Sequence, residues 1–332
     1  MRVAVVGAGS WGTALATLLV KKGLDVCLWA FEPEVAEQIN GSHENVSYLP
    51  GCELSENLRS TANLGEALRG AEIVISVSPA QVVGRVMAEA APYIENEALI
   101  VTASKGIETT TLRRMHEVIS GILSPAQIKG LTVLSGPSFA LEVANEIPTA
   151  VVAASESTEA ALRVQDLFQT SYFRVYTGSD VIGVELGGAL KNVTALGAGV
   201  ASGLGCGNNT LAALITRGLA EMRRLGVAMG ARASTFSGLA GMGDLVLTCT
   251  GAMSRNRTVG YRLGQGETLE AILADMSAVA EGVQTTHAVH DLAAKYGVEM
   301  PIAEEVFGIL TLGVDPEVAL KNLMERDPTR ED

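Results

Sequence analysis

The stretch VAVVGAGSWGTALA, residues 3–16, decides the fold of this chain. It begins as a short apolar run that is typical of a buried strand, and it ends in a pattern that is typical of a helix. Between the two lie Gly7, Gly9 and Gly12, in the spacing GxGxxG. In this context Gly7 permits a tight turn, Gly9 lets the backbone approach a pyrophosphate, and Gly12 lets the helix pack closely on the strand. The stretch predicts a dinucleotide site at the N-terminus of the helix.

The remainder of the first half alternates short apolar runs with helical patterns. The runs that are typical of buried strands cover residues 25–30, 71–78, 98–104, 131–136 and 149–154. Strands that alternate with helices indicate βαβ units and a mainly parallel sheet. We therefore expect an α/β fold whose first part is a doubly wound, mainly parallel sheet of the Rossmann type.

From residue 181 onward the periodicity is helical. The stretch 181–199 is apolar almost throughout, and residues 209–230 repeat apolar side chains at helical spacing. Asp180 is a candidate N-cap for the first of these helices. A chain of 332 residues is long enough for two domains. We predict a dinucleotide-binding domain, residues 1–179, and an all-α substrate-binding domain at the C-terminus, residues 180–332.

Composition and charge argue against several classes of partner. The formal net charge of -13 is unfavourable for binding nucleic acid or an anionic membrane. The four cysteines form no close pair, so neither a disulfide framework nor a metal site is predicted. The apolar stretch 181–199 carries Glu185 and Lys191, unlike a membrane span. We expect a cytoplasmic protein that binds no metal and no nucleic acid and does not insert stably into a membrane.

Lys191 is the unusual residue of the second half, because it lies among Gly, Ala, Leu and Val. A buried ammonium group needs a partner or gives up its proton. One interpretation is a lysine that extends out of a surface helix. The other is a general acid, which polarises a ketone and protonates its oxygen as a hydride arrives. The dinucleotide site favours the second interpretation, and a cation such as Lys105 would lower the pKa of Lys191 towards the working range.

Other polar residues of the second half have two interpretations each. The turn SRN, residues 254–256, is either a polar loop or a phosphate site, in which Arg255 offers a planar fork. Asp244 follows two glycines and either caps a helix or binds a substrate hydroxyl. Arg217 is spaced to pair with Glu221 on one helix, which is a structural role.

The chain resembles the bacterial NAD(P)-dependent glycerol-3-phosphate dehydrogenases. The resemblance covers nearly the whole chain and rests on motifs in the same order: GAGSWGTALA, YLP, SKGIE, SGPSFA, PTA, FRVY, GVELGGALKNV, ALITRGLAEM, GLAGMGDLVLTCT, SRNR and EG. It implies conversion of dihydroxyacetone phosphate to sn-glycerol 3-phosphate, the precursor of phospholipids. It also implies a homodimer.

The resemblance assigns roles to individual residues. Lys191 matches the catalytic proton donor and acceptor. Residues that match substrate contacts are Lys105, Gly136, Ser138, Lys191, Asp244, Ser254, Arg255 and Asn256. Residues that match cofactor contacts are Ser10, Trp11, Lys105, Ala140, Arg255, Val279 and Glu281, and to these we add Gly7, Gly9 and Gly12 of the turn and Phe31 beside the adenosine.

The residues after the second predicted strand bear on the choice between NAD and NADP. An acidic residue there accepts ribose hydroxyls, whereas an arginine receives a 2′-phosphate. The chain has Phe31 and Glu32, and Glu32 either binds ribose or begins the next helix. Many members of the family it resembles carry His or Arg in place of Phe31. We predict that NADH is used at least as well as NADPH; if NADPH is preferred, Arg59 is a candidate cation.

Two other functions are compatible with part of this pattern. A dehydrogenase of another small hydroxy acid would share both domains and the lysine, but it would not need the SRNR turn. A non-catalytic NAD-binding sensor would need the glycine turn and neither Lys105 nor Lys191. The phosphorylated substrate is therefore the favoured hypothesis.

Overall fold

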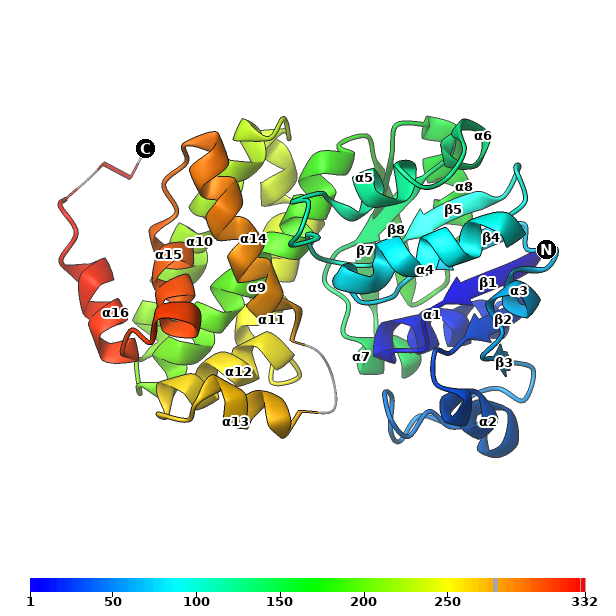
Figure 1. Ribbon diagram of the computed structural model, residues 1–332, viewed down its shortest axis with the longest axis horizontal. Coiled ribbons are helices and arrows are strands. Elements are labelled where there is room, and N and C mark those ends of the chain that lie inside the picture. The colour runs from blue at the N-terminus through cyan, green and yellow to red at the C-terminus, as the bar shows by residue number, and fades with distance from the viewer. Residues whose placement is uncertain (277–279, 329, 332) are drawn as a thin grey trace.

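The chain forms a sheet half and a helical half in a computed structural model, which describes residues 1–276, 280–328 and 330–331 (Figure 1). Within these residues the sheet has eight strands in the order β3-β2-β1-β4-β5-β6-β7-β8. All neighbours are parallel except β6 and β7. The strands are β1 (Arg2–Val6), β2 (Asp25–Trp29), β3 (Arg59–Thr61), β4 (Ile73–Ser76), β5 (Leu99–Thr102), β6 (Thr132–Ser135), β7 (Thr149–Ser155) and β8 (Phe173–Gly178). The predicted α/β fold is confirmed.

Helices cover both faces of the sheet. Successive side chains of a strand point to opposite faces, so apolar strands supply a core on each face that helices must cover. In β1, Val3 and Val5 belong to one apolar core, and Ala4 and Val6 belong to the other. The helices of the first core are α1 (Ser10–Lys21), α2 (Pro33–Ser42), α7 (Ala140–Ala144) and α8 (Thr158–Phe168). Those of the second are α3 (Leu64–Leu68), α4 (Val83–Ala90), α5 (Met115–Ser120) and α6 (Pro125–Ile128).

The helical half is built around α9 (Val181–Gly203), which is buried on almost every side and contacts α10, α11, α12, α14 and α15. A helix that is apolar all round is expected at the centre of such a bundle. The other helices are α10 (Asn208–Ala228), α11 (Asp244–Thr250), α12 (Arg255–Gly264), α13 (Leu269–Ala274), α14 (Glu281–Tyr296), α15 (Pro301–Phe307) and α16 (Pro316–Met324). A π-helical turn, Leu239–Gly243, precedes α11.

Glycines let α12 cross α9 at backbone contact. A Cβ atom on Gly199 would lie 2.2 Å from the carbonyl oxygen of Arg257, and one on Gly260 would lie 2.0 Å from that of Leu196. Side chains at these positions would push the helices apart. The close crossing brings the N-terminus of α12 beside the middle of α9, where Lys191 lies.

The connection between the two halves is short. β8 ends at Gly178, and α9 begins at Val181. The Asp180 side chain accepts a hydrogen bond from the Gly183 N–H at 3.0 Å, as predicted for an N-cap. The predicted division between residues 179 and 180 lies in this connection, and as a domain boundary it stays a prediction.

Two kinds of feature are absent from the described residues, a membrane-spanning helix and a cluster of metal ligands. No helix there is both long and apolar enough to cross a membrane. No group of three or more His, Cys, Asp and Glu side chains there is arranged to hold a metal ion.

Candidate active site

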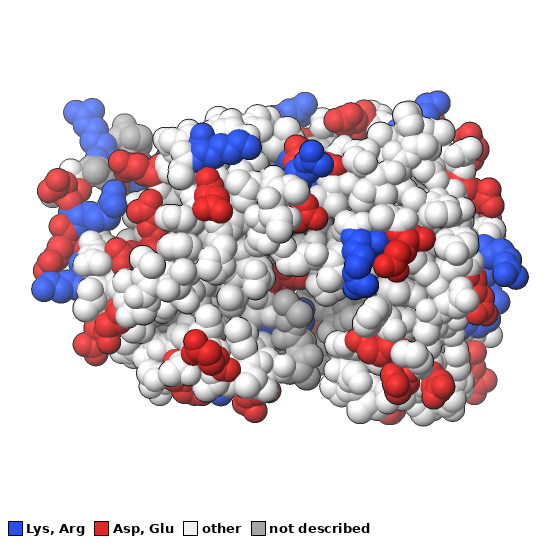
Figure 2. Space-filling view, in the orientation of Figure 1, with Lys and Arg blue, Asp and Glu red and all other residues white. Residues whose placement is uncertain are grey.

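A cleft of about 680 Å³ opens between the two halves, and its walls come from both. The sheet half contributes the glycine turn after β1 and the loops after β2, β4, β5 and β6. The helical half contributes α9, α11 and the start of α12. Figure 2 shows a hollow between the halves, and acidic and basic side chains spread over the surrounding surface.

The glycine turn has the backbone that a dinucleotide requires. Gly7 adopts φ +130, which L side chains rarely adopt, and a Cβ atom on Gly12 would lie 1.8 Å from the Gly7 carbonyl oxygen. A Cβ atom on Gly9 meets nothing within 4 Å, and Gly9 lines the cleft. A side chain at Gly9 would therefore project into free space that a pyrophosphate can use.

The first turn of α1 also offers hydrogen-bond donors. Gly9 is the N-cap, so no side chain caps this helix, and its first N–H groups are free to bind an anion. The buried Trp11 Nε1 has no hydrogen-bond partner among the described residues, although Trp11 lines the cleft. Ser10 lines it as well. These features fit NAD(P), whose phosphates would bind the α1 N-terminus.

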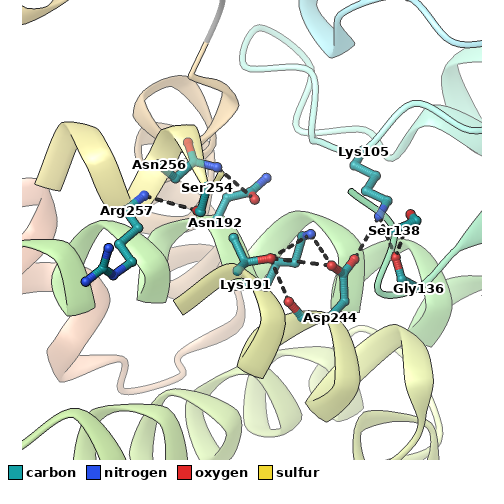
Figure 3. Close-up of polar contacts among 10 residues, drawn as sticks. Lys105, Gly136, Ser138, Lys191, Asn192, Asp244, Ser254, Asn256 and Arg257 are labelled. Carbon is teal, nitrogen blue, oxygen red and sulfur yellow. Dashed lines mark hydrogen bonds and ion pairs between the residues drawn. The ribbon is translucent and has the colours of Figure 1, made fainter. Parts of the chain in front are cut away.

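Three charged side chains meet where the cleft reaches the helical half (Figure 3). Asp244, from α11, is 1% exposed and uses both carboxylate oxygens. Its Oδ2 lies 2.8 Å from Lys105 Nζ, and its Oδ1 contacts Lys191 Nζ. Lys191 also donates to Thr248 Oγ1 at 3.0 Å. Lys105, from the loop after β5, also donates to the Gly136 carbonyl at 2.9 Å.

The electrostatics of this cluster favour a proton-transferring lysine. Burial, helped by the Lys105 ammonium, lowers the pKa of Lys191 to about 8, and the Asp244 carboxylate opposes the shift. Burial alone would raise the pKa of Asp244, but the ammonium groups of Lys105 and Lys191 hold it below its usual value. A lysine with a pKa of about 8 can both donate and accept a proton near neutral pH. Two ammonium groups and one carboxylate leave an excess positive charge beside the cleft.

A second polar chain connects α9, α12 and α14 at their crossing. Asn256 donates from Nδ2 to Asn192 Oδ1 at 3.0 Å, and its own Oδ1 accepts from the Gly282 N–H at 2.9 Å. Ser254 caps α12, because its hydroxyl oxygen accepts from the Arg257 N–H at 3.2 Å. Asn192, Ser254 and Asn256 all line the cleft. The SRN turn is therefore a helix N-terminus at the cleft and not a surface loop.

Arg255 extends from this helix N-terminus to the cleft wall. Among the described residues its guanidinium group has neither a hydrogen bond nor an ion pair. Glu281 lies near it and accepts a hydrogen bond from the Ala80 N–H of the sheet half at 3.2 Å. Burial raises the pKa of Glu281, and the Ala80 N–H and Arg255 oppose this shift.

Two family models match the chain. One, described as the NAD-dependent glycerol-3-phosphate dehydrogenase N-terminus, matches residues 2–161, and the other, described as the C-terminus, matches residues 180–321. The chain belongs to the NAD-dependent glycerol-3-phosphate dehydrogenase family. The resemblance inferred from the motifs is confirmed. The cofactor of this family is NAD(P), which agrees with the glycine turn.

Full-length relatives support this assignment. A protein of Citrifermentans bemidjiense, named glycerol-3-phosphate dehydrogenase (NAD(P)+), is 57% identical over 98% of this chain and 97% of its own length. A protein of the same name from Geobacter metallireducens is 56% identical over 99% of this chain and 98% of its own length. The crystal structure of glycerol-3-phosphate dehydrogenase from Coxiella burnetii has a TM-score of 0.93 and 39% identity, and the match covers 98% of this chain and 99% of that one.

Most site residues that the family resemblance predicts meet at this one cleft. Its lining includes Gly7, Gly9, Ser10, Trp11, Phe31, Lys105, Ser138, Ala140, Lys191, Ser254, Arg255, Asn256 and Glu281. Gly12, Gly136 and Asp244 lie behind the lining and hold it: Gly12 against the turn, Gly136 through its carbonyl, and Asp244 through its carboxylate. Val279 lies outside the described residues. The roles of all these residues stay predictions.

Two polar residues of functional interest, Thr248 and Arg114, were missed from the sequence. Thr248 accepts from Lys191 and donates to the Asp244 carbonyl at 2.6 Å, and its i+4 spacing from Asp244 could have indicated this. Arg114 donates to Glu185 at 2.6 Å across the two halves, a long-range pairing without a local signal. Arg217 and Glu221 form no close ion pair among the described residues: both oxygens of Glu221 accept N–H groups at the start of α15, and Arg217 acts on Glu221 through its charge alone.

Proposed function

We propose that the protein interconverts dihydroxyacetone phosphate and sn-glycerol 3-phosphate with NAD(P)H and NAD(P)+. The observation that carries this proposal is the cluster of Lys105, Asp244 and Lys191 at the end of a dinucleotide cleft. The full-length relatives that are named glycerol-3-phosphate dehydrogenase support the same substrate. NAD(P)H supplies the hydride for C2 of the ketone.

Lys191 is the proton donor and acceptor. In the reducing direction its ammonium group polarises the ketone oxygen and protonates it, and in the oxidising direction the neutral amine accepts the hydroxyl proton. Asp244 and Thr248 hold Nζ in place. The lysine side chain is therefore already ordered before the reaction, and no further entropy is lost in positioning it. Asn192, the next residue on α9, lines the cleft and is positioned to orient a substrate hydroxyl.

Arg255 and Lys105 are the groups for the substrate phosphate. The guanidinium of Arg255 at the cleft wall, which has no partner among the described residues, can bind two phosphate oxygens at once. The N-terminus of α12, where Ser254 and Asn256 lie, adds neutral donors beside it. Because the cluster carries an excess positive charge, an anionic substrate is favoured there even though the whole chain has a net charge of -13.

Turnover by the purified protein tests this function. Oxidation of NADH is followed by absorbance with dihydroxyacetone phosphate, with unphosphorylated dihydroxyacetone and with a small 2-oxo acid. We expect turnover with the phosphorylated ketone and little with the others. A preference for the 2-oxo acid would favour the hydroxy-acid dehydrogenase, and binding of NADH without any turnover would favour the non-catalytic sensor.

Replacement of the lysine tests the mechanism. Lys191→Ala should slow turnover by about 10²–10⁴-fold or more, as expected for loss of a general acid, and should leave NADH binding nearly intact. Lys321→Ala is the matched control, because Lys321 is an exposed lysine of α16. A Lys191→Ala protein with near-normal kcat would contradict the proposed role.

The remaining expectations from the family resemblance are also proposals. We infer that the product supplies phospholipid synthesis, that the protein acts in the cytoplasm, and that it is a homodimer. The subunit number is tested by the molar mass of the purified protein in solution, for which a monomer would contradict the last inference.

A further inference from the structure

The end of the cleft beside β2 carries two side chains of opposite charge. Glu32 and Arg85 both line the cleft there, together with Phe31. Phe31 follows the end of β2, and it is 61% exposed. In a Rossmann-type sheet the ribose of the dinucleotide binds at the end of this strand. The two charges therefore lie where NADH and NADPH differ.

Glu32 is oriented by a partner. It occupies the N-cap position of α2, yet its side chain does not cap that helix. Instead its Oε1 accepts a hydrogen bond from the Tyr48 hydroxyl at 2.9 Å, and Tyr48 also lines the cleft. The second carboxylate oxygen of Glu32 has no hydrogen bond to any of the described residues, so it can accept one from a ribose hydroxyl.

Arg85 comes from α4, on the other side of Phe31. Its guanidinium carbon lies 5.5 Å from the centre of the Phe31 ring. Its contact with Glu89, at 3.8 Å, is between exposed side chains and is weak. The stacking contact of an exposed pair is also weak. Arg85 is therefore held over Phe31 by weak contacts of exposed side chains, which it can leave without breaking a buried interaction.

Arg85 is the cation that can reach this part of the cleft. Among the described lining residues the other cations are Lys105, Lys191 and Arg255, which lie at the opposite end with Asp244 and Glu281. The candidate from the sequence, Arg59, pairs with Asp25 at the beginning of β2, whereas Phe31 follows the end of that strand. Arg59 is not among the lining residues.

We propose that Glu32 and Arg85 together set the choice between the two cofactors. Glu32, held by Tyr48, accepts the ribose hydroxyls of NADH and repels a 2′-phosphate. Arg85 leaves the face of Phe31 to bind the 2′-phosphate of NADPH, and so lets the site take both cofactors. The inference rests on the proposed dinucleotide function, but it assigns a residue outside the motifs that identify the family.

Direct binding tests the inference independently of turnover. Dissociation constants for NADH and NADPH are measured by fluorescence, without substrate, for the wild type and for Arg85→Gln. The glutamine keeps much of the length and removes the charge. We expect NADPH to bind about tenfold more weakly or worse, the loss of a charge-assisted hydrogen bond, and the NADH constant to change by less than about threefold.

Three comparisons isolate the 2′-phosphate. Arg59→Gln makes the same change of charge away from the cleft and should alter neither constant. Glu32→Gln should weaken NADH and strengthen NADPH. Competition by 2′,5′-ADP should respond to Arg85→Gln far more than competition by 5′-AMP does. Equal losses for NADH and NADPH, or no loss, would make Arg85 a stacking residue only and overturn the inference. A wild type that binds neither cofactor would contradict the proposed function itself.

Discussion

Two buried carboxylates are in contact with cations on or beside α9, and they differ in what surrounds them. Glu185, six positions before Lys191, accepts from Arg114 Nη1 at 2.6 Å and from the His116 N–H at 2.7 Å. Asp244 contacts two lysines and borders the cleft. Burial raises the pKa of Glu185 to about 7 despite Arg114 and the His116 N–H, whereas the pKa of Asp244 is lowered.

The difference lies in the number of cations and in the access to the cleft. Glu185 has one buried arginine, and this pair connects α9 to the start of α5 in the sheet half. Neither Glu185 nor Arg114 lines the cleft. Asp244 has two lysines, and both line the cleft. A neutral, enclosed pair can only position the helices. A cluster with an excess cation at an open wall can bind an anion and exchange a proton.

Of the two carboxylates, Asp244 should have the larger effect on catalysis when its charge is removed. Asp244→Asn keeps the shape of the side chain but leaves two ammonium groups without a carboxylate. The pKa of Lys191 should fall further, because Asp244 is the group that raises it, and Nζ should lose its position. We expect kcat to fall by about 10²–10⁴-fold, with NADH binding retained. A kcat within threefold of the wild-type value would show that Asp244 is not needed to hold the lysines.

Removing the charge of Glu185 should instead affect stability. Glu185→Gln removes the buried counterion of Arg114 and leaves it only the exposed carboxylate of Glu117, 3.0 Å away, and breaking a buried pair costs up to about 3–5 kcal/mol. We expect a lower denaturation midpoint in urea, while kcat of the folded protein at low temperature stays within a few-fold of wild type.

The matched control for this prediction is Lys321→Ala. It breaks a pair with Glu325 at 3.8 Å, in which both side chains are 67% exposed, and an exposed pair contributes less than about 1 kcal/mol. If Glu185→Gln lost as much kcat as Asp244→Asn, the two carboxylates would not have separate roles.

These two sites also show how far the sequence could be interpreted. The glycine turn and the alternating strands predict the sheet, because local sequence determines turns and periodicity. Lys191 was identifiable as a charge in an apolar helix. Its partner was not, because Asp244 is 53 residues away, and from local sequence it was expected to cap a helix or bind a hydroxyl. Arg114 and Glu185 are 71 residues apart. Pairings over such separations depend on packing, which no local pattern encodes.

Arg255→Ala should have a smaller effect, and on binding more than on the chemical step. In the proposed function its guanidinium binds the phosphate of both the substrate and the product, so its loss should raise KM for dihydroxyacetone phosphate with kcat nearly unchanged. A hydrogen bond to a charged group contributes about 1.5–3 kcal/mol, equivalent to about 10- to 150-fold in KM. An unchanged KM would mean that the SRN turn does not bind the phosphate.

The smallest expected effect is on the pH dependence, and it tests whether the second lysine tunes the first. In the proposed mechanism Lys191 must be protonated to reduce the ketone, so kcat for reduction should fall as pH rises through its pKa, and kcat for oxidation should rise through the same value. Burial and the Lys105 ammonium lower this pKa to about 8 against the opposing effect of Asp244. Lys105→Gln removes that ammonium, so Lys191 becomes the only lysine in contact with the Asp244 carboxylate. Both changes favour the protonated form of Lys191.

The midpoint of both profiles should therefore move to higher pH in Lys105→Gln, by the same amount in the two directions, because one group titrates in both. The midpoint is taken from kcat at saturating substrate, so a weaker KM caused by the loss of a substrate contact does not disturb it. Lys295→Gln, a lysine of α14 that lies over Tyr296 and not in the cleft, is the control for overall charge. A midpoint that stays in place or moves down would mean that Lys105 serves only to bind substrate, and that Asp244 and burial alone determine when Lys191 holds its proton.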